Sequence, residues 1–518
     1  MIVLVAIGAV LRVVFYLLNP ALSGDEAALA LNLMNRSVPD LFNQPLDALQ
    51  AAPAGFLVLQ KLAITVFGPG PHALRLVPLA AALAALTLLY PVAKRFVGTR
   101  AAVLALALFA ISDPLITYAA TNKQYSVDVA VALALYAVVL ARRRESFAAR
   151  EALLLALCAG MAVWLSHAAV FVVAAIVTLL LFEAARARRW ADLAWISSVV
   201  AFWLGTFAAA YFLTHGSVAR LQSALAGSHP ASLLGDHGLL QTYGGMIRAL
   251  FGIPAFSSGI RNAIALVAFI LVVSGAVALG RAQPTRAALL IAPGVFALLA
   301  IQLDKYAPFP RAFLFLIPAL VILAARGALS LTAAKRWQTV VLGAASFVIV
   351  LAAGAYATSD HLASRRDAVP LRVLRYLTEH AHRDDSLYVH VSAQLDFRYY
   401  LECGCFGSSE MVRKARSFWP VQPPASDRTF FRSASPDLVA GTYTEATPSA
   451  FRSDLAPFRR SARVWILMMY PAAKDERTLR DQRALVTYLR ENGRQREIFP
   501  RRGLEAPATV LLFDLRRR

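Results

Sequence analysis

The sequence predicts an α-helical polytopic membrane protein with a C-terminal α/β domain outside the cytoplasm. Of its 518 residues, 58% are hydrophobic and the mean hydropathy is +0.57, which is too apolar for a soluble globular protein. Long apolar runs recur through residues 1–357, whereas residues 358–518 alternate between strand and helix patterns. These two regions are the predicted transmembrane domain and the predicted C-terminal domain.

Eleven apolar runs are close to the roughly 20 residues that a membrane-spanning helix needs. They are 2–19, 73–94, 101–120, 125–141, 151–166, 167–185, 191–213, 260–280, 286–303, 310–327 and 337–357. The runs 151–166 and 167–185 could form one long helix, but the pattern favours two helices that are broken at Ser166 and His167.

Basic residues predict the orientation, because Lys and Arg concentrate in cytoplasmic loops. The basic connections lie at residues 94–100, 142–144, 186–189, 281–286 and 326–336. All of them fall on one side if the chain crosses eleven times and its N-terminus is cytoplasmic. Residues 20–72, 214–259 and 358–518 then lie outside the cytoplasm.

The formal net charge of +21 does not predict a nucleic-acid partner, because the basic residues lie between apolar runs. Such a charge suits a lipid bilayer with anionic headgroups or a substrate that carries phosphate. Arg greatly outnumbers Lys and Ala is abundant, which is typical of a GC-rich bacterial genome. The predicted location is therefore the plasma membrane of a bacterium.

Two further helices are predicted in the first outer loop, residues 20–72. Residues 24–38 have an amphipathic helical pattern, and residues 52–68 form an apolar stretch interrupted by Pro53 and Gly55. Both are expected to lie in the membrane interface. The loop 214–259 is rich in Gly, His and Ser and is expected to form a mobile flap over a site.

The tail has the pattern of a small α/β domain. A helix leads to a turn at Asp384 and Asp385, and the strand and helix patterns that follow are strands at 387–391, 463–470 and 508–515 and a helix at 478–493. Cys403 and Cys405 form a C-x-C pair. An outer compartment favours oxidation, but one intervening residue strains an internal bridge, so both states stay open.

The adjacent acids Asp25 and Glu26 follow directly on the first apolar run. One interpretation is structural, because Ser23 and Glu26 have the spacing of a capping box and Asp25 lies in the first turn, where the helix dipole favours negative charge. The other is catalytic, because a carboxylate at the membrane surface can take a proton from a hydroxyl or hold a divalent cation.

A second polar group precedes the run 125–141. Tyr125 and Asp128 are three residues apart and share a helix face, and Lys123 lies at the mouth of this helix. An interfacial belt of Tyr and Lys is the structural interpretation. It does not account for Asp128, because an acid at the start of a span needs a partner.

Charged residues also lie within or at the ends of other runs. They are Arg12 inside the first run, His167 at an outer end, and Lys305 and Arg311 at one outer mouth. A histidine in such a place is more often a hydrogen-bonded packing residue than a ligand. An Arg inside a membrane span is costly to bury and indicates function, and its geometry matches phosphate. These groups predict an outer-leaflet site for a lipid-linked phosphate with a polar head.

In their order and spacing, these stretches resemble the lipid-dependent glycosyltransferases of the C fold. This superfamily includes the protein O-mannosyltransferases, the lipid A aminoarabinose transferase and bacterial family 39 members such as rhizobial galacturonosyl transferases. The resemblance is carried by GDEA after the first run, by residues 67–119, by NKQYSVD, by WLSHAAVFV and by PFPRAFLFLIPALVILAARG. It covers residues 1–330 well and the tail loosely.

The resemblance implies a hexosyl- or pentosyltransferase that uses a polyprenyl-phosphate sugar as donor. The acceptor, a lipid, a glycan or a protein, attacks the anomeric carbon with inversion. Asp25 is then the general base, and Glu26 assists acceptor or metal binding. Phosphate is a good leaving group and needs cations rather than an acid.

The remaining roles follow from the same resemblance. The cations expected at the donor phosphate are Arg12, Lys123, Lys305 and Arg311. Tyr125 and Asp128 are expected to line the donor pocket, and His167 to contact the sugar or to support the structure.

The chain departs from the aminoarabinose transferase pattern in one place. That pattern has an acidic residue, Lys and Pro later in the first loop. Here the region contains Asp47 and Pro53 without a Lys between them, and Lys61 comes too late. A divalent metal ion at Glu26 therefore stays open.

Two other functions fit part of the sequence. A flippase for a lipid-linked sugar would use the same phosphate chemistry without forming a bond, but such transporters often contain internal repeats, and no repeat is evident in this sequence. A membrane scaffold with a partner-binding tail would leave the cluster from Lys123 to Asp128 without a role.

Overall fold

The computed structural model describes most of the chain as two compact units. Unit 1 comprises Met1–Asn19, Arg36–Val66 and His72–Arg365, and unit 2 comprises Pro20–Asn35, Phe67–Pro71 and Arg366–Arg518. The described residues are 1–22, 24–142, 149–225, 248–253, 258–303, 305–306, 309–332, 337–365, 369–405, 409–422, 432–433, 435–441, 448–459, 461–469, 476–500 and 508–516.

The described part of unit 1 is helical. Its sequence is rich in Ala and Leu, which are strong helix formers. Its elements are α1 (Ile2–Leu18), α3 (Asp40–Asn43), α4 (Ala54–Phe67), α5 (Pro71–Ala110), α6 (Asp113–Ala119), α7 (Tyr125–Ala141), α8 (Ala149–Leu165), α9 (Ala169–Arg186), α10 (Trp190–Leu225), α12 (Ser258–Ala282), α13 (Pro284–Gln302), the 3₁₀ helix η1 (Pro310–Leu316), α14 (Ile317–Thr332) and α15 (Trp337–Arg365).

All eleven predicted spans coincide with helices. The spans predicted at 73–94 and 101–120 correspond to α5 and α6. The two halves of α5 meet at Gly98, whose φ is 80°, and α6 begins after Ser112. The spans 151–166 and 167–185 are two helices, α8 and α9, as predicted. Among the described residues, six helices are long and apolar enough to cross a membrane. The count of eleven crossings stays a prediction.

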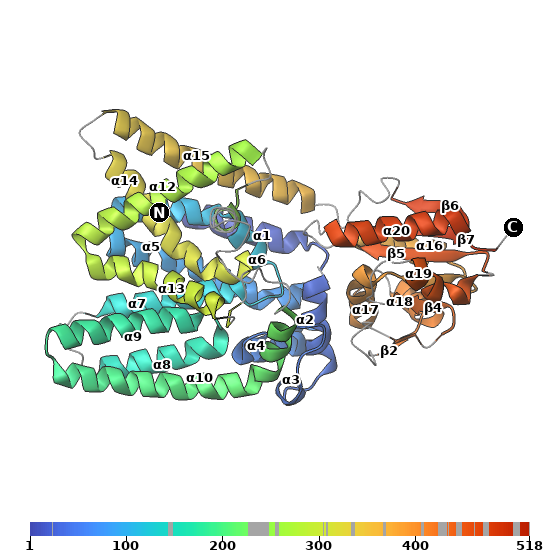
Figure 1. Ribbon diagram of the computed structural model, residues 1–518, viewed down its shortest axis with the longest axis horizontal. Helices are drawn as coiled ribbons and strands as arrows, with labels where there is room; N and C mark the ends of the chain where they lie inside the picture. The colour runs from blue at the N-terminus through green and yellow to red at the C-terminus, as the bar shows by residue number, and fades with distance from the viewer. Residues whose placement is uncertain are drawn as a thin grey trace. The chain divides into compact units, whose positions relative to one another are not determined.

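Close helix packing defines the core of unit 1. In Figure 1, α7, α8, α9 and α10 lie side by side, and α12 crosses α14. At that crossing Gly275 and Gly327 face the partner backbone, because a Cβ on Gly275 would collide with the carbonyl oxygen of Leu323, and one on Gly327 with that of Leu271. Small residues allow such approach between apolar helices, where packing rather than hydrophobic transfer drives association.

Unit 2 contains a five-stranded mixed sheet in the order β4-β1-β5-β7-β6. The strands are β1 (Ser386–Val389), β4 (Leu438–Ala440), β5 (Val464–Met469), β6 (Arg494–Phe499) and β7 (Ala508–Asp514), and β2 (Val421–Gln422) pairs with β3 (Arg432–Ser433). β1 is parallel to β4 and β5, whereas β7 is antiparallel to β5 and β6. Every residue of β5 and β7 is buried, as expected for strands covered on both faces.

The helices of unit 2 come from two parts of the chain. Those of the tail are α16 (Val369–His380), α17 (Gln394–Cys403), α18 (Ser409–Phe418), α19 (Pro448–Asp454) and α20 (Glu476–Asn492), with the 3₁₀ helices η2 (Val391–Ala393) and η3 (Ala456–Phe458). The other helix is α2 (Gly24–Asn35), from the first loop. Cys403 and Cys405 form a disulfide.

The structure agrees with the sequence on the elements of the tail and differs on both loops. The three predicted strands and the helix at 478–493 correspond to β1, β5, β7 and α20. The prediction of a loop from residue 214 is wrong at its start, because α10 continues to Leu225. Of the rest of that flap, residues 226–247 and 254–257 lie outside the described residues. The helices predicted at 24–38 and 52–68 are α2 and α4, but Glu26–Leu33 are buried without interruption, so α2 has no continuous exposed face.

We expect Gly327→Val to destabilise the protein by roughly 1–3 kcal/mol, because the new side chain forces α12 and α14 apart. Thermal unfolding of the full chain in detergent, followed by size-exclusion chromatography, measures the loss. Gly205→Ala is the matched control, since a Cβ there meets no atom within 4 Å. Equal stability of the Gly327 variant and wild type would contradict the tight crossing.

The tail should lose stability as the pH falls. Burial lowers the pKa of His390 to about 4, so the folded state binds fewer protons than the unfolded state below the usual pKa near 6.5. The stability contributed by neutral His390 is therefore lost between about pH 6.5 and pH 4, and amounts to about 2 kcal/mol from pH 7 to pH 5. Thermal unfolding of His390→Asn should depend less on pH than that of wild type.

Candidate functional site

The adjacent acids lie in the first turn of α2, in unit 2. Asp25 is half-buried and Glu26 is 5% exposed, and both side chains have partners within the structure. The N-terminal end of a helix favours negative charge, which accounts for their stability there. The capping box proposed with Ser23 falls on a residue outside the described part of the chain.

Asp128 of α7 contacts the turn between α8 and α9 in unit 1. Its carboxylate is 5% exposed and is hydrogen-bonded to Ser166. The hydroxyl oxygen of Ser166 also accepts from the backbone N–H of Ala169 at 3.1 Å, which ties it to the start of α9. The break that the sequence places at Ser166 and His167 is therefore the point where α7 and α9 come together. This contact brings Asp128 close to His167, two of the predicted donor residues.

Aromatic side chains surround the same acid. Tyr125 packs edge-on against Tyr118, with ring centroids 5.0 Å apart. Tyr306 lies within electrostatic reach of both Asp128 and Tyr125, and its hydroxyl donates to the carbonyl of Ala312 at 2.6 Å. Tyr125 and Tyr306, which come from distant parts of the chain, therefore both lie near Asp128.

Lys123 belongs to a second buried polar group in unit 1. It is 7% exposed, and its Nζ donates to the side-chain oxygen of Gln50. Its neighbour Asn122 accepts from Gln60 Nε2 at 2.6 Å, and the same nitrogen donates to the carbonyl of Leu74 at 2.7 Å. The sequence analysis missed Gln50, Gln60 and Asn122. The signal was available in Gln60, a polar residue within the apolar pattern of α4.

Arg12 connects α1 to α5 through hydrogen bonds. It is 1% exposed, and its guanidinium donates to Gly8 O at 2.9 Å, Ala110 O at 3.0 Å and Phe109 O at 3.1 Å. The last two carbonyls belong to the final turn of α5, where carbonyl groups lack the usual donor four residues on. These contacts give Arg12 a structural role, and the phosphate contact predicted for it stays a prediction.

Of the two remaining cations, Lys305 follows α13 and Arg311 lies within η1. Lys305 is exposed, and its backbone N–H donates to the carbonyl of Ala300. The guanidinium of Arg311 lies 5.0 Å from the ring centroid of Phe309 and has a further partner. The sequence analysis also missed Arg75, which is 1% exposed and donates to Asn19 Oδ1 at 3.1 Å, where α1 ends.

The described residues differ in how well they suit a metal ion and a lipid chain. Among the described residues, no three His, Cys, Asp or Glu side chains lie close enough together to hold a metal ion. No step of the reaction is derived through a metal ion. An apolar groove of about 400 Å³ lies between α8 and α10, lined by Leu157, Gly160, Met161, Trp164, Leu165, Phe202 and Thr206.

Comparison with known proteins identifies the fold. Residues 51–224 match the family described as dolichyl-phosphate-mannose-protein mannosyltransferase. The crystal structure of ArnT from Cupriavidus metallidurans in the apo state is 12% identical, with 98% of this chain and 97% of that chain covered at a TM-score of 0.51. Its structure bound to undecaprenyl phosphate has the same identity and coverage at a TM-score of 0.50. No curated protein matches the chain in sequence.

The chain is a multi-pass membrane protein with the fold of the C-type glycosyltransferases. The predicted helical fold class and the resemblance to that superfamily are therefore confirmed. AglB, the oligosaccharyltransferase of Archaeoglobus fulgidus, in complex with an inhibitory peptide and a dolichol-phosphate, is also 12% identical, with 97% of this chain and 73% of that chain covered at a TM-score of 0.49. The roles of the individual site residues stay predictions.

We expect Arg12→Met to lower the thermal stability of the protein by about 3 kcal/mol, because it leaves three buried carbonyls without their charged donor. Thermal unfolding in detergent measures the loss, with Arg100→Met at an exposed position as control. A variant with wild-type stability but weakened binding of undecaprenyl phosphate would instead support the phosphate role of Arg12.

Proposed function

We propose that the chain is a glycosyltransferase that moves a sugar from a polyprenyl-phosphate donor to a hydroxyl of a lipid, glycan or protein. The observation that carries the proposal is the location of the two buried polar groups. Lys123, Asp128 and Ser166 all fall within residues 51–224, the region that matches the mannosyltransferase family. ArnT, which shares the fold, has been crystallised with undecaprenyl phosphate, and this supports a polyprenyl phosphate as the lipid part of the donor.

The proposed reaction needs a base, an acceptor and a leaving group. Asp25 takes the proton of the acceptor hydroxyl as the acceptor oxygen attacks the anomeric carbon. The bond between that carbon and the phosphate oxygen breaks, and polyprenyl phosphate leaves with the electron pair. Attack from the face opposite the leaving group inverts the anomeric configuration. Glu26, the adjacent acid, binds the acceptor.

Cations stabilise the phosphate that leaves, since it carries the developing negative charge. Lys123 is the first candidate, because it is buried in the matched region, where a charge acts more strongly than in water. Arg311 and Lys305 are the other candidates. Tyr125 and Asp128 line the donor pocket beside His167, and the apolar groove between α8 and α10 suits part of an isoprenoid chain.

The proposed location is the plasma membrane of a bacterium, with the acids and the tail on the extracytoplasmic side. This orientation follows from the basic connections, which all fall on the opposite side of the predicted topology. A lipid-linked donor suits that location, because its chain is retained in the bilayer.

We expect Asp25→Asn to lower transfer by about 10²- to 10⁴-fold, the usual contribution of a general base, while the protein stays folded. Membrane glycolipids and envelope glycans of a deletion strain, complemented with wild type or variant, are compared by mass spectrometry. Asp40→Asn is the matched control, an exposed acid in the same loop that is hydrogen-bonded to Ser37.

Two outcomes would contradict the proposal. Full restoration of the glycan by Asp25→Asn would exclude Asp25 as the base. Movement of labelled polyprenyl-phosphate sugar across liposomes that contain the pure protein, without a new glycoside, would favour a flippase.

A further inference from the structure

The segment that carries Asp25 belongs to the same compact unit as the C-terminal tail. Residues Pro20–Asn35 and Arg366–Arg518 are both part of unit 2, and helix α17 of the tail packs against α2. Residues more than 350 positions apart in the chain are therefore neighbours. The contacts between these two helices show how the acidic turn is held.

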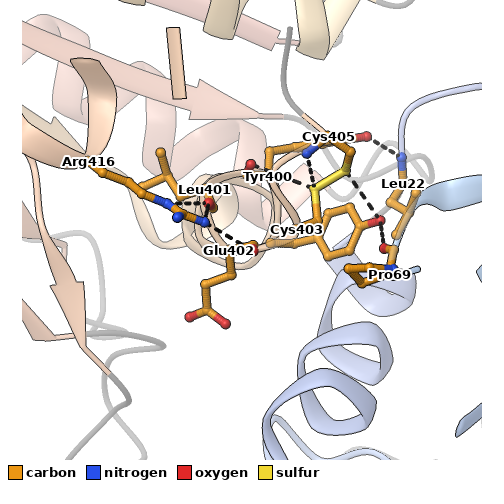
Figure 2. The surroundings of a disulfide bond; sticks show 9 residues. Leu22, Pro69, Tyr400, Leu401, Glu402, Cys403, Cys405 and Arg416 are labelled. Atoms are coloured by element: carbon orange, nitrogen blue, oxygen red, sulfur yellow. Dashed lines mark hydrogen bonds between the residues drawn. A yellow bond between two sulfur atoms is a disulfide. The ribbon is translucent and has the colours of Figure 1, made fainter. Parts of the chain in front are cut away.

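The first contact lies just before the acids. The backbone N–H of Leu22 donates to the hydroxyl of Tyr400 at 2.9 Å (Figure 2). Leu22 is 3% exposed and Tyr400 is 1% exposed, so water does not replace this acceptor. A buried N–H without a partner costs about as much as a lost hydrogen bond, which fixes the backbone three residues before Asp25.

The second contact lies at the other end of α2. Asn35 Nδ2 donates to Glu402 Oε2 at 2.7 Å. The other carboxylate oxygen of Glu402 accepts from Arg398 Nε at 2.6 Å, one helical turn earlier in α17. Hydrogen bonds thus connect both ends of α2 to α17.

A buried acid of α17 lies close to the first turn of α2. Asp396 of α17 is 5% exposed, and a Cβ placed on Gly24 would lie 3.8 Å from its Oδ2. Its Oδ1 is buried and has no hydrogen-bond partner among the described residues. Burial, and then the charge of nearby Glu26, raise the pKa of Asp396 well above its usual value. The shift favours the neutral form of this carboxyl group, which limits the negative charge next to Glu26.

Helix α17 is itself held firmly at its C-terminal end. Arg416 of α18 donates to the carbonyls of Leu401 and Glu402, and the Cys403–Cys405 disulfide follows directly (Figure 2). The hydroxyl of Tyr399 donates to the carbonyl of Pro69 at 3.0 Å, and the sulfur of Cys405 lies 3.8 Å from that hydroxyl. The face of α17 that packs against α2 is therefore held in place by other residues of unit 2.

We propose that α17 is a positioning element of the transferase, in which Tyr400, Asp396 and Glu402 fix the turn that carries Asp25 and Glu26. The inference rests on the proposed function, because it gives the tail a part in holding the general base. These three are positioning residues, since they act through the turn and not on the substrate. A base that is held in place needs no reordering in the transition state, whereas a misplacement of about 1 Å can cost 100-fold in rate.

The test uses Tyr400→Phe in the full chain, because it removes only the hydroxyl that accepts from Leu22. Hydrogen exchange of peptides that cover residues 20–35 should become about five-fold faster, as expected for one lost hydrogen bond. Transfer, measured as formation of the glycan that wild type restores, should fall by about five-fold or more. Binding of undecaprenyl phosphate should stay unchanged. Tyr376→Phe is the matched control, since its hydroxyl bonds Glu497 within the tail.

A second pair of variants tests Asp396. Asp396→Asn keeps the size and polarity of a neutral carboxyl group and should retain transfer within about two-fold. Asp396→Leu removes the polar group and should lower transfer by about ten-fold, again without changing undecaprenyl phosphate binding. A purely structural role would instead lower the yield or the lipid binding of both variants together.

The outcomes separate the inference from the proposed function. Unchanged exchange in Tyr400→Phe would overturn the docking of the turn. Faster exchange with wild-type transfer would overturn positioning. Full transfer by Asp25→Asn would overturn the proposed base, while the exchange measurement would still report the contact between α17 and α2.

Discussion

A polar side chain that is buried among apolar helices must find its partners within the protein, because no water is available to replace them. This requirement fixes unit 1 at the points where its helices meet. Arg12 joins α1 to the end of α5, Lys123 is bonded to Gln50 of the first loop, and Asp128 is bonded to Ser166 between α8 and α9. The last two contacts involve residues expected at the donor phosphate and sugar, so the same bonds that stabilise the fold also set the geometry of the candidate site.

The sequence predicts the helices well, because a membrane imposes a simple length rule on apolar runs. The break at Ser166 is one example, since a polar pair between two apolar runs favours two helices over one long helix. The strands β1, β5 and β7 were also visible, because their residues are buried on both faces and read as continuous apolar runs. β6 was not, since it reads Arg-Gln-Arg-Glu-Ile-Phe and only its pairing with β7 makes it a strand.

The sequence could not predict contacts that depend on distant partners. Gln60 is an ordinary polar residue in the pattern of α4 until Asn122 lies beside it. Likewise, the pattern around Arg12 does not show that its guanidinium donates to the carbonyls at the end of α5. The helix α2 was expected in the membrane interface because its sequence is amphipathic. Its burial depends on residues of the tail, and Leu22 and Tyr400 are separated by 378 positions.

The burial of α2 also bears on the role of the tail. Asp25 lies on a loop of about 50 residues, and a loop of that length has many conformations in which a base is misplaced. Docking on α17 removes most of these conformations before the substrate binds, which is the usual benefit of a preorganised site. A deletion of the tail would remove this docking surface together with any acceptor-binding surface. Loss of transfer after such a deletion would therefore not identify the tail as the acceptor-binding domain, whereas the hydroxyl of Tyr400 can be removed without removing anything else.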